Sequence, residues 1–260
     1  MPGRVAIVGA GPGPADLLTV RAAAALRAAQ VVLYDDLVSV EVLGLCPSSA
    51  ELIYVGKRRG KRGSSQEQIN ALMIQHARKN RAVVRLKSGD PAVFGRLGEE
   101  LDALREAGIP FEIIPGITAA AAAASAAELT LTDRRAASTL VVLTAHSARG
   151  NLRPQPALDL ERTTFAVYMP GPDYAKTARE LVEMGIDAAT PCAVVSNACR
   201  GEQKVRLITL AGLGSARGII APAVLIVGRV AGRQQFAESL LFLEKTHDAI
   251  GNRIENPAYQ

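Results

Sequence analysis

Short apolar runs alternate with helix-like segments along the first half of the chain, and this alternation limits the possible folds more than any other feature. Parallel strands need a long crossover between them, usually a helix, so the pattern predicts an α/β fold with a mainly parallel sheet. The expected strands are Val5–Val8, Val31–Tyr34, Ile53–Val55, Val83–Leu86 and Phe111–Ile114, and the expected helices are Leu17–Ala29, Gln66–Asn80 and Glu99–Ala107.

The pattern changes after Pro115 and Gly116, where an alanine-rich helix is followed by longer strands. We therefore expect an N-terminal α/β domain at residues 1–116, a C-terminal α/β domain at 117–235, and a helix with a polar tail at 236–260. In the second domain the expected helices are Ala119–Ala127 and Tyr174–Met184, the expected strands are Thr139–Thr144, Thr164–Met169, Ala193–Ser196, Lys204–Leu210 and Ala223–Val227, and Ala148–Leu160 is expected to be a loop.

The positive charge of the chain is concentrated in one place. The 260 residues carry a net charge of +5, and the segment 57–62 holds five basic residues, which leaves the rest neutral. With 5 Phe, 5 Tyr and no Trp, the chain has little material for stacking nucleic-acid bases, so we expect no nucleic-acid partner. The segment is either a solvated surface loop or a site for a polyanionic ligand.

The cysteines and the apolar segments bear on location. Cys46, Cys192 and Cys199 are odd in number and show no CxxC spacing, which is typical of a cytoplasmic protein. Ile113–Ala127 is shorter than the about 20 residues of a membrane span, so no membrane partner is expected.

The three histidines have no metal-ligand spacing, and we predict no metal site.

A loop rich in glycine and proline, Gly9–Pro14, follows the first expected strand, and Asp35 ends the second. The arrangement is similar to a dinucleotide fingerprint, but Pro14 stands where the third glycine should be, and Pro12 removes an N–H that would bind pyrophosphate. A ligand without phosphates fits such a loop better, and a purely structural turn is the alternative.

Two further loops follow strands at the edge where open α/β sheets bind ligands. In Lys87–Pro91, Asp90 either presents its carboxylate to a ligand or caps a helix that begins at Pro91. The nearby side chains of Arg96, Glu99 and Glu100 either face a ligand-binding cleft at this edge or are solvated on the surface. In Pro115–Thr118, Thr118 is a candidate N-cap, and the alanines after it either favour the helix or admit a flat ligand.

Taken together and in this order, the loops resemble those of the S-adenosylmethionine-dependent tetrapyrrole methylases. The resemblance runs from residue 5 to about 232. It is carried by Val8–Gly13, Val32–Ser39, Tyr54–Arg58, Gln66–Asn70, Val84–Pro91, Phe94–Arg96 with Glu99 and Glu100, Gly108–Phe111, Pro115–Ala119 and Pro222–Val230.

The resemblance implies two α/β domains, a mainly parallel sheet in the first, a mixed sheet in the second, the cofactor S-adenosyl-L-methionine in the cleft between them, and a homodimer. It implies Asp35 and Lys57 as proton acceptor and donor, Arg96 and Glu99 in proton handling or substrate binding, and Arg58 and Arg134 on the carboxylates of a tetrapyrrole substrate. The implied cofactor-binding residues are Pro12, Ser88, Gly89, Asp90, Val93, Thr118, Ala119, Met169, Ala198, Pro222 and Ala223.

The chain departs from the family pattern at a few positions. Ser88 replaces a glycine, Leu97 replaces a glycine, and Asp133 replaces a histidine. These changes bear on the substrate more than on the cofactor, because Ser is small enough for a close backbone approach wherever φ is not positive. The alternatives are a family member that acts on a later precorrin, and a nucleotide-binding or nucleic-acid-binding module that uses the glycine loop and the basic segment.

Overall fold

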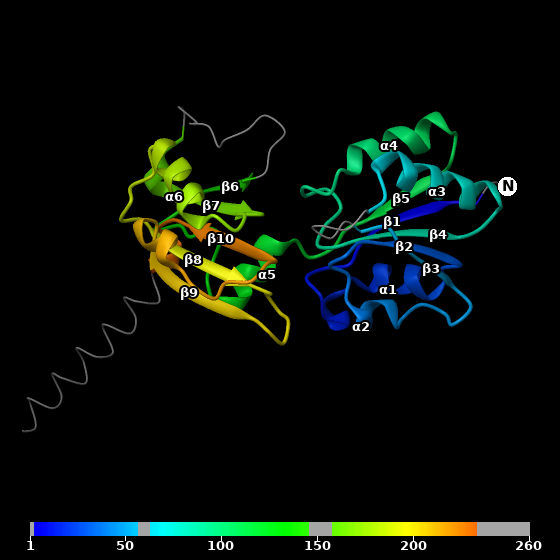
Figure 1. Cartoon of the computed structure of the whole chain (residues 1–260), viewed down its shortest axis with the longest axis horizontal. Helices are drawn as coiled ribbons and strands as arrows, with labels where there is room; N and C mark the ends of the chain where they lie inside the picture. Colours follow the sequence, from blue (N-terminus) through cyan, green and yellow to red (C-terminus); the bar gives the residue numbers. More distant parts are fainter. Residues whose placement is uncertain (1–2, 57–62, 146–157, 233–260) are drawn as a thin grey trace, which may run out of the picture. The chain divides into compact units, whose positions relative to one another are not determined.

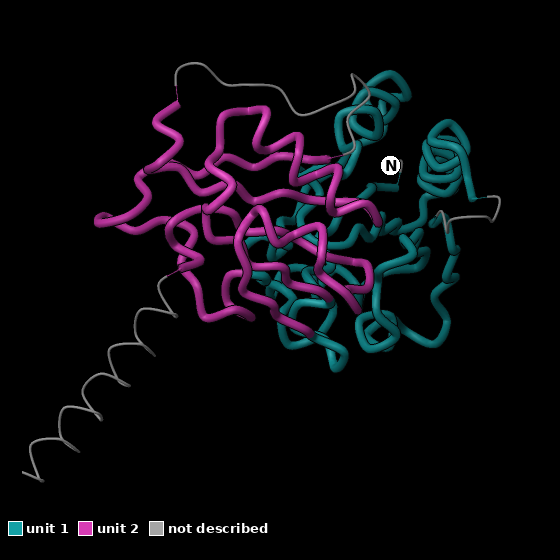
Figure 2. Tube along the Cα trace, turned by 60° about the vertical axis from the view of Figure 1, so that its left-hand side comes forward, with its two compact units in different colours: residues 1–123, 197–203 teal, residues 124–196, 204–260 magenta. Residues whose placement is uncertain are grey.

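The computed structural model describes residues 3–56, 63–145 and 158–232, and these form two compact units (Figure 2). Unit 1 comprises Met1–Ala123 and Asn197–Gln203, and unit 2 comprises Ala124–Ser196 and Lys204–Gln260. The chain thus returns to unit 1 for one short segment between two strands of unit 2. The expected domain boundary at residue 117 stays a prediction, and the expected tail at 236–260 lies outside the described residues.

Unit 1 contains a parallel sheet of five strands, which confirms the α/β fold (Figure 1). Its order is β3-β2-β4-β1-β5, so β4 and β1 are interior strands and have neighbours on both sides. The strands are β1 Val5–Gly9, β2 Val31–Tyr34, β3 Glu51–Tyr54, β4 Val83–Lys87 and β5 Phe111–Ile114.

Helices cover both faces of this sheet, because successive residues of a strand point to opposite sides (Figure 1). In β1, Val5 and Ile7 pack with residues of α3 and α4, whereas Ala6 and Val8 pack with residues of α1 and α2. The helices are α1 Val20–Arg27, α2 Val40–Leu43, α3 Gln66–Arg78 and α4 Leu97–Glu106.

Polar side chains cap the starts of α1 and α3. Thr19 accepts a hydrogen bond from the Ala22 amide, so α1 begins at Val20, later than the expected start at Leu17. Leu17 instead ends a 3-10 turn, η1 (Ala15–Leu17). Ser65 forms a capping box with Gln68 at the start of α3. The short helix α2 lies in a region for which we had predicted no element, since four residues show no clear period.

Unit 2 contains a mixed sheet of five strands in the order β6-β7-β10-β8-β9. Only β6 and β7 pair in parallel, and the other pairs are antiparallel. Helix α6 (Tyr174–Glu183) packs on one face, with Leu181 in a core that includes Phe165 and Leu225. The strands are β6 Thr139–Thr144, β7 Thr163–Tyr168, β8 Pro191–Ser196, β9 Lys204–Thr209 and β10 Ala223–Val227.

The remaining elements are short. The alanine-rich helix α5 (Ala119–Ala126) follows β5, and 3-10 turns lie at η2 (Leu160–Arg162), η3 (Ala211–Ser215) and η4 (Arg229–Gly232). Most of the expected loop at 148–160 lies outside the described residues. None of the helices within the described ranges is long and apolar enough to cross a membrane.

Candidate functional site

The loops that follow β1 and β4 meet beyond the carboxyl end of the sheet of unit 1. The amide of Gly11 donates to the Gly89 carbonyl at 3.1 Å, and the amide of Gly89 donates back to Gly11 at 2.8 Å. From this point the chain continues to β2 on one side of the sheet and to β5 on the other. Such a topological switch point is where open α/β sheets bind ligands.

The loop after β5 approaches the same two loops, and glycine makes this approach possible. A Cβ atom at Gly9 would lie 2.5 Å from the Gly116 nitrogen and 2.7 Å from the Gly89 oxygen, so no other residue fits there. The carboxylate of Asp90 accepts one hydrogen bond from the Ala92 amide and another from the Gly116 amide, at 2.8 and 3.0 Å. Asp90 therefore ties two loops together, and a turn follows it where we had considered a helix.

The backbone beside these contacts is open. Gly89 has a φ of +67°, and a Cβ atom there would meet no atom closer than the Ala119 nitrogen at 3.9 Å. Ser88 is not among the non-glycine residues with positive φ in the described part of the chain, so serine is tolerated there without strain. Val93 is half-buried and donates its amide to the Asp90 carbonyl at 3.2 Å.

Arg200 fixes the glycine and proline loop from the other side. Its Nε donates to the Pro12 carbonyl at 2.7 Å and its Nη2 to the Leu37 carbonyl at 2.6 Å. A Cβ atom at Gly13 would lie 2.7 Å from Nε, so this glycine leaves room for the guanidinium. Burial lowers the pKa of Arg200. Because Ala198 lies two residues away, this segment brings two predicted cofactor residues, Pro12 and Ala198, into one assembly.

A buried group of charged side chains lies near the carboxyl end of β2. Arg85 of β4 donates from Nε to Oε1 of Glu100 at 2.9 Å, and its Nη2 lies 2.6 Å from Oδ1 of Asp35. Lys87 also donates to Oε1 of Glu100, at 2.9 Å. Burial, the largest influence, lowers the pKa of Lys87, since the charged amine loses its water. Gln66 of α3 adds a longer contact to the same oxygen, at 3.4 Å.

Sequence reasoning placed Asp35 at this edge but did not find Arg85, Lys87 or Arg200. We had considered that Glu100 faces a cleft or is solvated, and its side chain is instead completely buried. A signal was present, because Glu100 falls on the apolar side of its helix together with Leu97, Leu101 and Leu104.

Arg96 and Glu99 form a second, exposed pair at the start of α4. Nε and Nη2 of Arg96 donate to the two carboxylate oxygens of Glu99, at 2.7 and 2.6 Å. This bidentate contact lowers the pKa of Glu99 and raises that of Arg96. Arg96 has a φ of +54° and Phe94 one of +51°, so the loop holds two residues in the left-handed region, which often marks functional sites.

The other predicted residues are distributed as follows. Arg134 is an exposed residue of unit 2, beside Asp133, whose carboxylate accepts hydrogen bonds from Arg135 at 2.8 to 3.2 Å. Met169 follows β7 with a φ of +49°, and the residue is 46% exposed, so it does not belong to the core. Lys57 and Arg58 lie outside the described residues. Thr118 and Ala119 open α5, and Pro222 and Ala223 lie at the start of β10.

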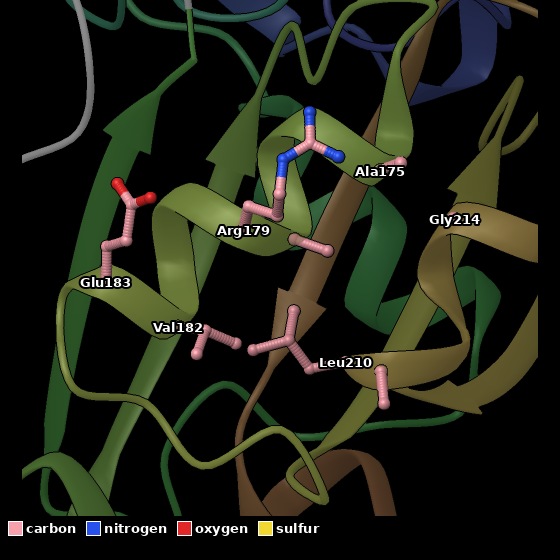
Figure 3. Close-up of a pocket in the computed structure, with 8 residues that line it drawn as sticks. Ala175, Arg179, Val182, Glu183, Leu210 and Gly214 are labelled. Carbon is pink, nitrogen blue, oxygen red and sulfur yellow. The ribbon is translucent and has the colours of Figure 1, made fainter.

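A hollow of about 410 Å³ lies between α6 and η3 of unit 2 (Figure 3). It is lined by Ala175, Arg179, Val182 and Leu210 among others, and it contains none of the predicted site residues. In Figure 3, the charged ends of the Arg179 and Glu183 side chains do not point toward one another. Among the described residues there is no group of three or more His, Cys, Asp or Glu side chains that could hold a metal ion.

Comparison with known proteins gives a family match. The family model described as Tetrapyrrole (Corrin/Porphyrin) Methylases matches residues 4–214. A curated relative, siroheme synthase 1 of Yersinia pseudotuberculosis, is 45% identical over 230 residues, which is 88% of this chain and 49% of the relative. The chain therefore spans about half the length of the curated relatives it matches.

Solved structures are similar over nearly the whole chain. Uroporphyrin-III C-methyltransferase from Thermus thermophilus has a TM-score of 0.75 and 38% identity, covering 89% of this chain and 95% of that one. The same enzyme complexed with S-adenyl homocysteine has a TM-score of 0.72 and 36% identity, with coverage of 88% and 93%. A cobalt precorrin-4 methyltransferase has a TM-score of 0.76 and 30% identity, with coverage of 88% and 95%.

Proposed function

The chain belongs to the tetrapyrrole (corrin/porphyrin) methylases, and from this premise we propose that it methylates uroporphyrinogen III on two ring carbons to give precorrin-2. As a member of this family it is an S-adenosyl-L-methionine-dependent C-methyltransferase, and S-adenosyl-L-homocysteine is the second product. Precorrin-2 is the precursor of sirohaem, cobalamin or haem d1. A cytoplasmic homodimer without nucleic-acid or membrane partners belongs to the proposal.

The observation that carries the proposal is the loop assembly at the switch point, because its form suits this cofactor. A methyl sulfonium cofactor without phosphates needs backbone groups and small side chains near it more than a set of N–H donors for pyrophosphate. The open backbone at Gly89, the small residues Ser88 and Ala119, and the proline at position 12 meet these requirements. S-Adenosyl-L-methionine supplies the electrophilic methyl group when it is bound.

The chain's own residues would then align the reactants and accept a proton. A reduced pyrrole carbon is itself nucleophilic, so correct orientation provides much of the rate acceleration. Asp35 is held at the carboxyl edge of the sheet and is partly exposed, which suits a residue that accepts the proton lost after methylation. Glu99 is the second candidate for this role, and Lys57 is the proposed proton donor.

Basic side chains would bind the carboxylates of the substrate. Arg96 and Arg134 are both exposed, and a guanidinium can bind a carboxylate through two parallel hydrogen bonds. In the described structure Arg96 already makes such a contact with Glu99, and a substrate carboxylate would compete for it. Arg58 is proposed for the same role on sequence grounds alone.

A second candidate function is methylation of a later precorrin by the same fold. The similarity to the cobalt precorrin-4 methyltransferase favours it, because its TM-score of 0.76 matches that of the uroporphyrin-III enzyme. The higher sequence identity to the uroporphyrin-III enzyme, 38% against 30%, makes it the second choice.

Incubating the purified protein with methyl-labelled S-adenosyl-L-methionine and uroporphyrinogen III tests the proposal. We expect labelled product with this substrate and none when it is omitted. Label on a precorrin but not on uroporphyrinogen III would support the second candidate instead. A titration with S-adenosyl-L-homocysteine, NAD and an oligonucleotide separates the enzyme from a nucleotide-binding or nucleic-acid-binding module, and binding of NAD alone would contradict both proposals.

A further inference from the structure

The buried charges of unit 1 occupy positions that a parallel sheet normally fills with apolar residues. Val83, Arg85 and Lys87 alternate along β4, an interior strand, and therefore point to the same face. Val83 packs in the core shared with α3 and α4, so Arg85 and Lys87 continue this row toward the carboxyl end. Glu100 of α4 contacts both of these side chains, and its own side chain has no exposed surface.

Every hydrogen-bonding edge of the Arg85 guanidinium has a partner. Nε donates to Glu100 at 2.9 Å, and Nη1 donates to the carbonyls of Leu33 and Leu86 at 3.4 and 3.2 Å. Nη2 pairs with Oδ1 of Asp35 at 2.6 Å. The side chain of Arg85 is 3% exposed and that of Asp35 is 28% exposed, so the contact joins a buried, fixed group to one that solvent reaches.

Stability alone does not account for this network. Replacing a buried ion pair by well-packed apolar residues of similar volume is often neutral or stabilising, because desolvation offsets the attraction. Here Oε1 of Glu100 accepts from Arg85 and Lys87, whereas the buried Oε2 has no hydrogen-bond partner in the described structure. Leaving such an atom unsatisfied costs about 1–3 kcal/mol. What the network does provide is a defined position for the Asp35 carboxylate.

We propose that Arg85 is a positioning residue for Asp35, and that Glu100 anchors Arg85 from behind. Arg85 touches neither substrate nor cofactor in this proposal, and it acts through the carboxylate that it holds. The inference rests on the proposed function, since it assigns to Asp35 the acceptance of the proton.

The test is a double-mutant cycle on methyl transfer to uroporphyrinogen III, using Arg85→Lys, Asp35→Asn and the combination. Lysine keeps the buried charge, but it cannot hold Glu100 and Asp35 on two edges of one planar group. A misplaced catalytic group can lower the rate by up to about a hundredfold, so we expect kcat to fall by about tenfold to a hundredfold. We expect KM for uroporphyrinogen III and the Kd of S-adenosyl-L-homocysteine to change by less than about twofold. In the Asp35→Asn background, Arg85→Lys should have no further effect on kcat.

Two further variants make the result interpretable: one is a control, and the other is used if Arg85→Lys does not fold. Arg81→Lys is the matched control, because Arg81 pairs with Glu51 at 2.6 Å near the opposite end of β4, and its kcat should equal that of the wild type. If Arg85→Lys does not fold, Arg85→Met/Glu100→Gln removes one cation and one anion together, and we expect the same loss of kcat with unchanged Kd for S-adenosyl-L-homocysteine.

An unchanged kcat in Arg85→Lys, or in Arg85→Met/Glu100→Gln if Arg85→Lys does not fold, would overturn the inference. An equal loss of kcat from Arg85→Lys in the presence and absence of Asp35 would overturn it as well. A wild-type protein that does not turn over uroporphyrinogen III would instead contradict the proposed function, so the two failures are distinguishable.

Discussion

Glu99 and Glu100 are neighbours on α4, each is paired with an arginine, and their surroundings are opposite. The side chains of Arg96 and Glu99 are about half exposed, at 51% and 52%, whereas those of Arg85 and Glu100 are buried. One step along a helix turns the side chain by about 100°, which is enough to move a carboxylate from solvent to core. The two glutamates therefore form two kinds of arginine–carboxylate pair. The exposed pair is free to change partners, and the buried pair is fixed.

The two pairs differ in what they contribute. An exposed pair adds little to stability, because water and salt screen it and both side chains lose freedom when they pair. It can exchange its partner for a substrate carboxylate at small cost. A buried pair cannot be broken cheaply, since the remaining charge has no water around it. We therefore assign substrate binding to the exposed pair and positioning to the buried one.

The largest expected effect comes from breaking the buried pair. Glu100→Ala leaves Arg85 and Lys87 without their shared anion, and we expect the free energy of unfolding to fall by about 3–5 kcal/mol. Urea denaturation followed by circular dichroism measures this change. Glu99→Ala is the matched control on the adjacent residue, with an expected change of about 0–1 kcal/mol. Equal losses in the two variants would show that burial does not distinguish the pairs.

Arg200 stands between these extremes, because it is half-buried and its partners are carbonyl groups. Arg200→Ala leaves the Pro12 and Leu37 carbonyls unpaired, and we expect a loss of about 1–3 kcal/mol in stability. Because the loop at Pro12 loses its support, the Kd of S-adenosyl-L-homocysteine should also rise, as measured by calorimetric titration. Arg179→Ala, an exposed arginine at the hollow between α6 and η3, should change neither quantity. An unchanged Kd for Arg200→Ala would exclude its role at the cofactor loop.

A smaller effect is expected from the pH dependence of the buried pair. The pKa of Lys87 is below its ordinary value of 10.5 in the folded protein. At a pH between the folded pKa and 10.5, the Lys87 amine is protonated in the unfolded chain but not in the folded one. This group therefore makes the free energy of unfolding rise as the pH rises through that range. Lys87→Met should remove that part of the slope in unfolding experiments at alkaline pH. A slope identical to that of the wild type would contradict a lowered pKa.

The smallest expected effect on stability comes from the exposed pair. Arg96→Gln should change the free energy of unfolding by about 1 kcal/mol or less. We expect KM for uroporphyrinogen III to rise, because a cation for its carboxylates is lost, while the Kd of S-adenosyl-L-homocysteine stays the same. Steady-state kinetics and titration together test this, and equal losses in both quantities would contradict the division of roles.

Sequence reasoning predicted the elements better than the contacts. Val31–Tyr34 and Phe111–Ile114 were predicted with their observed bounds, because short apolar runs between turn residues define strands clearly. The edge position of Asp35 followed from the end of its strand. Its contact with Arg85 could not be predicted, since it depends on β2 and β4 being neighbours although β3 lies between them in the chain.

Arg200 shows the same limitation more strongly. Its partners Pro12 and Leu37 are more than 160 residues away along the chain, and no local pattern marks an arginine that donates to backbone carbonyls. Glu100 is among the residues that carry the family resemblance, but the resemblance does not say which of the two adjacent glutamates is buried. The apolar residues on its side of the helix could have shown this.

We claim that this chain transfers two methyl groups to each uroporphyrinogen III, and the ratio of S-adenosyl-L-homocysteine formed to uroporphyrinogen III consumed measures this transfer. With S-adenosyl-L-methionine in excess, we expect a final ratio of two and a product heavier than the substrate by two methylene units in mass spectrometry. No S-adenosyl-L-homocysteine from uroporphyrinogen III, together with turnover of a later precorrin, would contradict the claim.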